Sequence, residues 1–150
     1  MAKEIEHKFL VKDNSFLYKA TEARFIKQGY LALNKNLEIR ISIRDDQHTK
    51  LCIKSANSSL VRDEYEYTIP YADAVELYNK CEKKLHKTRY IIPEEDGLFW
   101  EVDVIHGFYK ELIIAEIEIP EGKELPVKYP SFIGDNVTGN PEYYNKNIAY

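Results

Sequence analysis

Charged and apolar residues alternate along many segments of this chain. In the run Glu4-Ile5-Glu6-His7-Lys8-Phe9, the charged side chains stand two residues apart, and side chains on a strand point to opposite faces with this period. Such alternation is typical of strands that have one apolar and one polar face. It predicts eight strands, near residues 3–11, 24–33, 37–44, 49–55, 61–69, 86–92, 98–105 and 111–119.

Helical spacing of apolar residues begins after Pro70 and predicts a helix over residues 71–84. A short helix is expected over 15–20, and the stretch after Pro120, rich in Pro, Gly and Asn, indicates loops with one or two short helices. Closure of eight antiparallel strands removes their exposed edges. The predicted fold is therefore a mainly β (α+β) single domain over residues 1–150, an eight-stranded antiparallel closed barrel with a few short helices packed outside.

Composition narrows the classes of partner. The net charge of -4 and the pI near 5.6 argue against nucleic acid as a partner, because binding to it needs clustered positive charge. No apolar run reaches membrane-spanning length, and the N-terminus lacks the layout of a secretory signal. The sequence therefore predicts no membrane partner and a cytoplasmic location, with Cys52 and Cys81 as reduced thiols.

The charged faces of the strands permit two interpretations. If they point outward, the protein is a plain barrel with an apolar interior and a solvated surface, which is the common outcome for alternating strands. If they point inward, the interior must hold water, ion pairs and a charged ligand, since unpaired buried charges are costly. Clustered carboxylates favour Mg²⁺ or Mn²⁺, and clustered Arg and Lys favour phosphate oxygens. A metal-bound polyphosphate satisfies both signs of charge.

Nine short motifs, in order along the chain, resemble those of CYTH domains, the triphosphate tunnel metalloenzymes. This family includes thiamine triphosphatases, inorganic tripolyphosphatases, class IV adenylate cyclases and fungal-type RNA triphosphatases, and the resemblance to its short bacterial members covers nearly the whole chain. The motifs are Glu4-x-Glu6-x-Lys8, Gln28-Gly29-Tyr30-Leu31, Glu38-Ile39-Arg40, Ile53-Lys54-Ser55, Arg62-Asp63-Glu64-Tyr65-Glu66, Lys87-Thr88-Arg89-Tyr90, Glu101-Val102-Asp103-Val104, Ala115-Glu116-Ile117-Glu118 and Tyr144-Asn145-Lys146.

The resemblance implies that the charged faces line an eight-stranded tunnel. It implies a Mg²⁺ or Mn²⁺ site made by carboxylates, which are Glu116, Glu118, Glu4, Glu6 and Asp103. It also implies a set of cations that bind the triphosphate, which are Lys8, Arg40, Arg44, Lys54, Arg62, Lys87 and Arg89. Lys8 and Tyr30 are the expected catalytic pair for proton transfer. An equal alternative places Arg62 in ion pairs with Glu38, Glu64 and Glu66 that shape the tunnel, and Cys52 is expected to be a small filler.

The chain departs from the family at Ser42, because family members commonly read Arg-x-Arg where this chain has Arg40-Ile41-Ser42. Arg44 is the expected substitute for the missing arginine. It follows Ser42 by two residues on the same face, which is about 7 Å along a strand.

The sequence therefore predicts a metal-dependent hydrolase of inorganic tripolyphosphate or of a small organic triphosphate. The alternatives are an adenylate cyclase that converts ATP to cyclic AMP, a polyphosphate-binding module without turnover, and the plain barrel. If the charges line the interior, the apolar faces point outward, and large apolar patches usually mark an interface. A homodimer is expected on that ground.

Overall fold

The structure is a computed structural model that describes residues 2–34, 36–56, 61–107 and 112–149, without the side chains of residues 2–4, 56, 61 and 62. Its strands are β1 (Ala2–Val11), β2 (Glu22–Leu33), β3 (Leu37–Arg44), β4 (His48–Ala56), β5 (Val61–Thr68), β6 (Lys83–Pro93), β7 (Phe99–Ile105), β8 (Leu112–Pro120) and β9 (Ile133–Asn136). Its α-helices are α1 (Phe16–Lys19), α2 (Tyr71–Lys80) and α3 (Asn145–Ile148).

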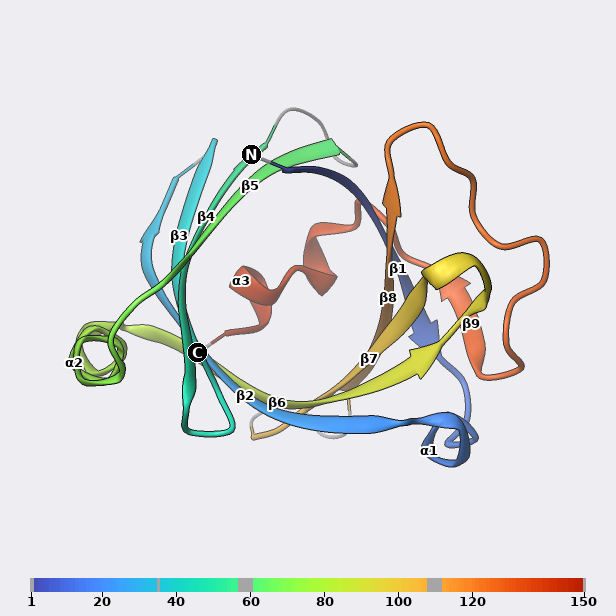
Figure 1. Ribbon diagram of the computed structural model, residues 1–150, viewed down its shortest axis with the longest axis horizontal. Helices are drawn as coiled ribbons and strands as arrows, with labels where there is room; N and C mark the ends of the chain where they lie inside the picture. The colour runs from blue at the N-terminus through green and yellow to red at the C-terminus, as the bar shows by residue number, and fades with distance from the viewer. Residues whose placement is uncertain (1, 35, 57–60, 108–111, 150) are drawn as a thin grey trace.

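The strands form one antiparallel sheet in the order β5-β4-β3-β2-β6-β7-β8-β1-β9. Strand β1 pairs with β8 along one edge, where Glu6 is the partner of Glu118 and Lys8 is the partner of Glu116. Along its other edge, β1 pairs first with β5, over Ala2–Ile5, and then with β9. The view in Figure 1 looks into the ring of strands, with α2 outside the ring and α3 within it.

All eight predicted strands are confirmed, most with ends that differ by one to three residues, and one further strand is present. The predicted helix over 71–84 ends at Lys80, and β6 begins at Lys83. Leu85 fits both the helical period and the strand period. On β6 it shares a face with Lys87 and Arg89, and this strand period prevailed over its helical spacing from α2. Strand β9 was not predicted, because its sequence Ile-Gly-Asp-Asn is poor in strand-forming residues.

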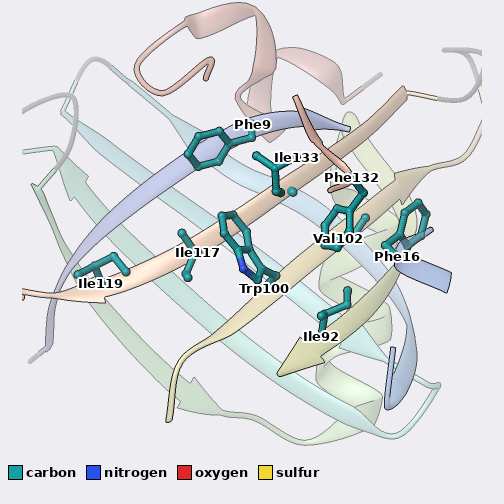
Figure 2. Close-up of a cluster of buried hydrophobic side chains, with 10 residues drawn as sticks. Phe9, Phe16, Ile92, Trp100, Val102, Ile117, Ile119, Phe132 and Ile133 are labelled. Atoms are coloured by element: carbon teal, nitrogen blue, oxygen red, sulfur yellow. The ribbon is translucent and has the colours of Figure 1, made fainter. Parts of the chain in front are cut away.

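Most apolar side chains pack on the outside of the sheet. The largest cluster lies on the outward faces of β1, β6, β7 and β8, and α1 and the segment around Phe132 cover it (Figure 2). Trp100 is fully buried at its centre, with the Phe9 ring edge-on at a centroid distance of 5.5 Å. A second cluster joins Ile41 and Ile43 of β3 to Ala74 of α2. These coverings leave the inward faces of the strands to the charged residues.

At one end of the ring, the inward positions change from charged to apolar. Tyr30, Leu85, Ile105 and Ile114 pack there against Ile148 of α3. Leu85, Ile105 and Ile114 each stand two positions from a charged residue on the same face, and Tyr30 stands two positions from Gln28. The short C-terminal helix therefore packs against the inner face, whereas the sequence predicted short helices only on the outside.

No helix in the described part of the chain is both long and apolar enough to cross a membrane.

Candidate active site

The inward faces of the strands enclose a cavity of about 520 Å³. Strand alternation places the charged member of each pair toward it, while the apolar neighbours face the outer clusters. This confirms, for the described residues, the prediction that the charged faces point inward. Eight of the predicted site residues line the cavity: Glu6, Lys8, Arg40, Arg44, Lys54, Arg89, Glu116 and Glu118.

Three of the predicted metal-ligating carboxylates lie on the paired strands β1 and β8. Glu6 and Glu118 are directly opposite each other, and Glu116 is one alternation further along. The Nζ atom of Lys8 lies 3.5 Å from Glu116 and 3.9 Å from Glu6. The Nζ atom of Lys54, from β4, lies 4.0 Å from Glu6. Glu6 and Glu116 are therefore held by cations, and all three carboxylates line the cavity.

Two predicted residues cannot be placed by their side chains. Glu4 and Arg62 are cross-strand partners in the pairing of β1 with β5, but both side chains lie outside the described residues. Their expected roles stay predictions.

Asp103 lies at the centre of a buried ion-pair network. Arg89 binds it with two nitrogens, Nε at 2.7 Å and Nη2 at 2.8 Å, and Lys87 Nζ lies 2.7 Å from its Oδ2 atom. Asp103 and Lys87 are 1% and 0% exposed, and neither lines the cavity. Both Asp103 oxygens are thus engaged by cations, which does not favour the predicted role of Asp103 as a metal ligand.

Burial and ion pairing in this network shift the pKa values of its members. Burial lowers the pKa of Lys87, and the nearby Asp103 only partly offsets this. Burial alone would raise the pKa of Asp103, but the charges of Arg89 and Lys87 outweigh it and leave that pKa below its ordinary value. Burial also raises the pKa of Glu101, which accepts a hydrogen bond from Arg89 Nη1 at 2.9 Å and lines the cavity.

Arg40 is the buried cation of β3. Its Nη1 atom lies 3.8 Å from Glu38. Burial acts to lower the pKa of Arg40, but Tyr30 and Glu38 outweigh that effect and raise it. Tyr30 itself is 5% exposed and packs in the apolar cluster around Ile148, so it does not line the cavity. The expected partnership of Tyr30 with Lys8 stays a prediction.

Ser42, a neutral side chain, stands where the family pattern has its second arginine. Ser42 lies directly opposite Gln28 of β2 and Lys50 of β4. Gln28 is 3% exposed, and its Oε1 atom has no hydrogen-bond partner among the described residues. Arg44 lines the same cavity beyond this patch, where its Nε atom lies 3.9 Å from Asp45.

Two groups of cavity residues were not predicted as site residues. Cys52, Glu64 and Glu66 bring one ligand atom each within 4.8 Å of one another, and the expectation that Cys52 is a small filler stays a prediction. The second group is the C-terminal segment, which reaches the cavity with Tyr144 and Lys146. The charged stripe on β4 and β5 is a sequence signal for the first group. The C-terminal segment carries no periodic signal, and only the motif Tyr144-Asn145-Lys146 pointed to it.

The C-terminal segment contacts Lys8 directly. Lys8 Nζ donates a hydrogen bond to the Tyr143 carbonyl at 3.0 Å and lies 5.3 Å from the centroid of the Tyr144 ring. The Lys8 backbone N–H donates to Thr138 Oγ1 at 2.9 Å. Lys8, which comes near the start of the chain, is therefore held by residues from its end.

An antiparallel sheet that curves around a cavity rich in both carboxylates and cations defines a β-protein with a charged internal site. The chain is 38% identical over 151 residues to an inorganic triphosphatase of Acetivibrio thermocellus, an alignment that covers 99% of this chain and 94% of the relative. It is 32% identical over 149 residues to an inorganic triphosphatase of Nitrosomonas europaea, covering 97% of this chain and 96% of the relative. No protein-family model matches the chain.

The fold agrees with these sequence relatives. A crystal structure of an inorganic triphosphatase superposes with a TM-score of 0.65 and 29% identity, covering 99% of this chain and 95% of that one. The chain belongs to the CYTH family of triphosphate tunnel metalloenzymes, as its nine ordered motifs predicted.

Proposed function

We propose that this protein is a divalent-metal-dependent hydrolase that releases phosphate from inorganic tripolyphosphate, or from a small organic triphosphate, in its charged cavity. The observation that carries the proposal is the cavity itself, where carboxylates of β1 and β8 face cations of β3, β4 and β6. Both sets of charges are needed for a metal-bound polyanion and neither is needed for a solvated barrel. The two curated relatives, both inorganic triphosphatases, support the same reaction.

The cavity becomes a tunnel if the sheet closes into an eight-stranded barrel. The pairing of β1 with β5 over Ala2–Ile5 supports closure, because β5 stands at the opposite end of the strand order. Strand β9 then lies outside the closed ring as an addition to β1.

Glu6, Glu116 and Glu118 are the residues that would hold the metal, with Glu4 beside them. The donors are all carboxylate oxygens, which is the set that Mg²⁺ and Mn²⁺ prefer over softer metals. When bound, such an ion supplies positive charge that polarises a phosphoryl oxygen and lowers the pKa of a coordinated water. Like charges on neighbouring strands repel, so a bound cation would also relieve the repulsion among these carboxylates.

The cations of the cavity would bind and orient the phosphate groups. Lys8, Arg40, Lys54 and Arg89 line the cavity and would donate to phosphate oxygens, with arginine able to donate two parallel hydrogen bonds. Arg44 also lines the cavity, and the same role is proposed for Arg62 because it precedes Glu64 by two residues on β5. Lys87 and Asp103 would act behind Arg89, because they fix its guanidinium from the buried side.

Hydrolysis needs little covalent chemistry from the chain. The fixed cations would stabilise the charge that develops on the leaving phosphate, and they need no rearrangement to do so because carboxylates already hold them in place. Lys8 is suited to hold or move a proton at its Nζ atom, since it lies between Glu116 and the Tyr143 carbonyl. Tyr30 remains the proposed partner of Lys8 in this transfer, at the buried end of the cavity.

The test is phosphate release from tripolyphosphate, thiamine triphosphate, ATP and pyrophosphate with Mg²⁺ or Mn²⁺. We expect metal-dependent release by the wild type and a loss of roughly hundredfold or more in Glu116→Gln, because one ligand charge is removed. The matched control is Glu121→Gln, at an exposed position just after β8. Silence with every substrate would overturn the hydrolase, and cyclic AMP formation from ATP would replace it with a cyclase.

A further inference from the structure

Strand pairing brings three metal-binding side chains together on the inner faces of β4 and β5. Cys52 is directly opposite Glu66, and Glu64 stands one alternation away from this pair, opposite Lys54. One ligand atom each of Cys52, Glu64 and Glu66 lies within 4.8 Å of the other two, and all three residues line the cavity. None of them belongs to the carboxylate site proposed on β1 and β8.

The Cys52 thiol is buried without a hydrogen-bond partner. Cys52 is 3% exposed, and within the described ranges of the chain its Sγ atom makes no hydrogen bond. Cys81 differs, because its Sγ atom donates a hydrogen bond to the Leu77 carbonyl at 3.3 Å and packs against Gly29 outside the cavity. Cys52 therefore presents a buried sulfur ligand, not engaged by any hydrogen bond, to two carboxyl groups.

The two carboxyl groups beside Cys52 lie in contact with each other. Glu64 and Glu66 are within hydrogen-bonding distance, although an ionised carboxylate can only accept hydrogen bonds. Two carboxylates in such contact repel unless a proton or a cation lies near both. Lysines supply part of that charge, with Lys50 Nζ 2.9 Å from Glu66 and Lys54 Nζ 3.9 Å from Glu64. The Lys50–Glu66 pair is exposed, so it is weak and a metal ion can displace it.

We propose that Cys52, Glu64 and Glu66 form a second metal site, the thiolate site, which binds a thiophilic divalent cation such as Zn²⁺ or Cd²⁺. The sulfur ligand selects such a cation, whereas Mg²⁺ and Mn²⁺ prefer oxygen ligands alone. Bonds of about 2.0–2.3 Å to Zn²⁺ place tetrahedral ligand atoms roughly 3.5 Å apart, which small rotations of the two glutamate side chains achieve. The thiol releases its proton on binding, and a water completes the tetrahedron.

The thiolate site adjoins the carboxylate site on β1 and β8 without sharing a ligand. Lys54 Nζ lies 3.9 Å from Glu64 and 4.0 Å from Glu6, so one ammonium group stands between the two sites. Mg²⁺ at the carboxylate site therefore need not displace Zn²⁺ from the thiolate site. This difference allows the two sites to be measured separately.

The test is titration of the metal-free, reduced chain with Cd²⁺ in excess Mg²⁺, read by the ultraviolet charge-transfer band of a Cd²⁺–thiolate bond. We expect the wild type to bind one Cd²⁺ per chain with this band. Cys52→Ser should lose the band. The matched control is Cys81→Ser, which removes the buried thiol outside the cavity and should keep the band. No substrate is present, so the result does not depend on whether the protein hydrolyses triphosphates.

Calorimetry with Zn²⁺ tests the two carboxylates while the thiol stays in place. The double variant Glu64→Gln with Glu66→Gln should bind Zn²⁺ roughly ten- to hundredfold more weakly, because two charged ligands are lost. The control is Glu76→Gln, at an exposed position on α2, which should bind as the wild type does. This arm decides the matter even if Cys52→Ser fails to fold.

Four outcomes would overturn the inference. They are a wild type without the thiolate band, an undiminished band in Cys52→Ser, loss of the band in Cys81→Ser, and wild-type Zn²⁺ affinity in the double glutamine variant. Displacement of the bound Cd²⁺ by Mg²⁺ would overturn it as well, since it would mean that oxygen ligands alone hold the ion.

Discussion

Asp103 shows how one buried side chain can organise several cations. Its two oxygens are engaged by Arg89 and Lys87, and it is 1% exposed. A buried charge pair adds little to stability when compared with apolar residues, but removal of one partner leaves an uncompensated charge. The position of Arg89 in the cavity therefore depends on an acid that does not line the cavity.

We predict that Asp103→Asn lowers the free energy of unfolding by about 3–5 kcal/mol at pH 7, because the buried Lys87 loses its ion-pair partner and Arg89 keeps only Glu101. The folded-state pKa of Asp103 is below 3.8, so its stabilisation is present above pH 3.8 and is lost as the pH falls further. Each unit of this pKa shift corresponds to about 1.4 kcal/mol. Urea unfolding of wild type and variant between pH 7 and pH 2.5 measures the difference, which should narrow below about pH 4.

Asp135→Asn is the matched control, since Asp135 is exposed on β9. It should unfold as the wild type does across the whole range. A difference between Asp103→Asn and wild type that stays constant down to pH 2.5 would mean that Asp103 is not the group that titrates.

At the scale of elements, Gly29 determines how closely α2 approaches the sheet. A Cβ atom at this position would lie 2.8 Å from Cys81 Sγ and 3.1 Å from Tyr78 Cδ1. Both neighbours belong to the last turn of α2 or to its cap. The glycine in the run Gln28-Gly29-Tyr30 is thus required for packing on the outer face, while its two neighbours serve the inner face.

We predict that Gly29→Ala destabilises the protein by about 1–3 kcal/mol, because the added methyl group overpacks the contact between β2 and α2. Chemical denaturation measures the change. The double variant Gly29→Ala with Cys81→Ala should recover part of the loss, since it removes the sulfur that the new Cβ atom meets. Strictly additive losses in the double variant would contradict the steric explanation.

The errors in element prediction have a common cause. Leu85 satisfied the helical spacing of the preceding segment as well as the strand alternation, and a local pattern cannot choose between them. The contact of Leu85 with Ile148 at the inner end of the cavity is what decides for the strand. Strand β9 likewise exists because β1 offers it an edge, and its own residues do not favour a strand.

At the scale of the whole molecule, β2 presents apolar side chains to the solvent on its outer face. Phe25 and Leu31 are 40% and 37% exposed, and larger exposed apolar patches usually mark an interface. We therefore keep the prediction of a homodimer. Light scattering after size exclusion should give twice the chain mass of 17.6 kDa, and Leu31→Lys should reduce it to one chain. A single-chain mass for the wild type at high concentration would contradict the prediction.

The sequence by itself determined the strands, the charged face of each strand and the family, whose resemblance implied that these faces point inward. These follow from a period of two, which acts between neighbouring residues, and from motifs such as Glu4-x-Glu6-x-Lys8 that need no knowledge of contacts. It also provided eight of the residues that line the cavity, because alternation assigns a face to every residue of a strand.

Only the tertiary structure decided which charges meet and how the cavity ends. The pairing of Asp103 with Arg89 and Lys87, the contact of Lys8 with the Tyr143 carbonyl, and the entry of α3 into the ring join residues distant in the sequence. Such contacts depend on strand register and on the packing of a few apolar side chains, and neither leaves a periodic signal in the chain. For that reason the sequence named Lys146 only as part of a motif, and the fold decided that it lines the cavity.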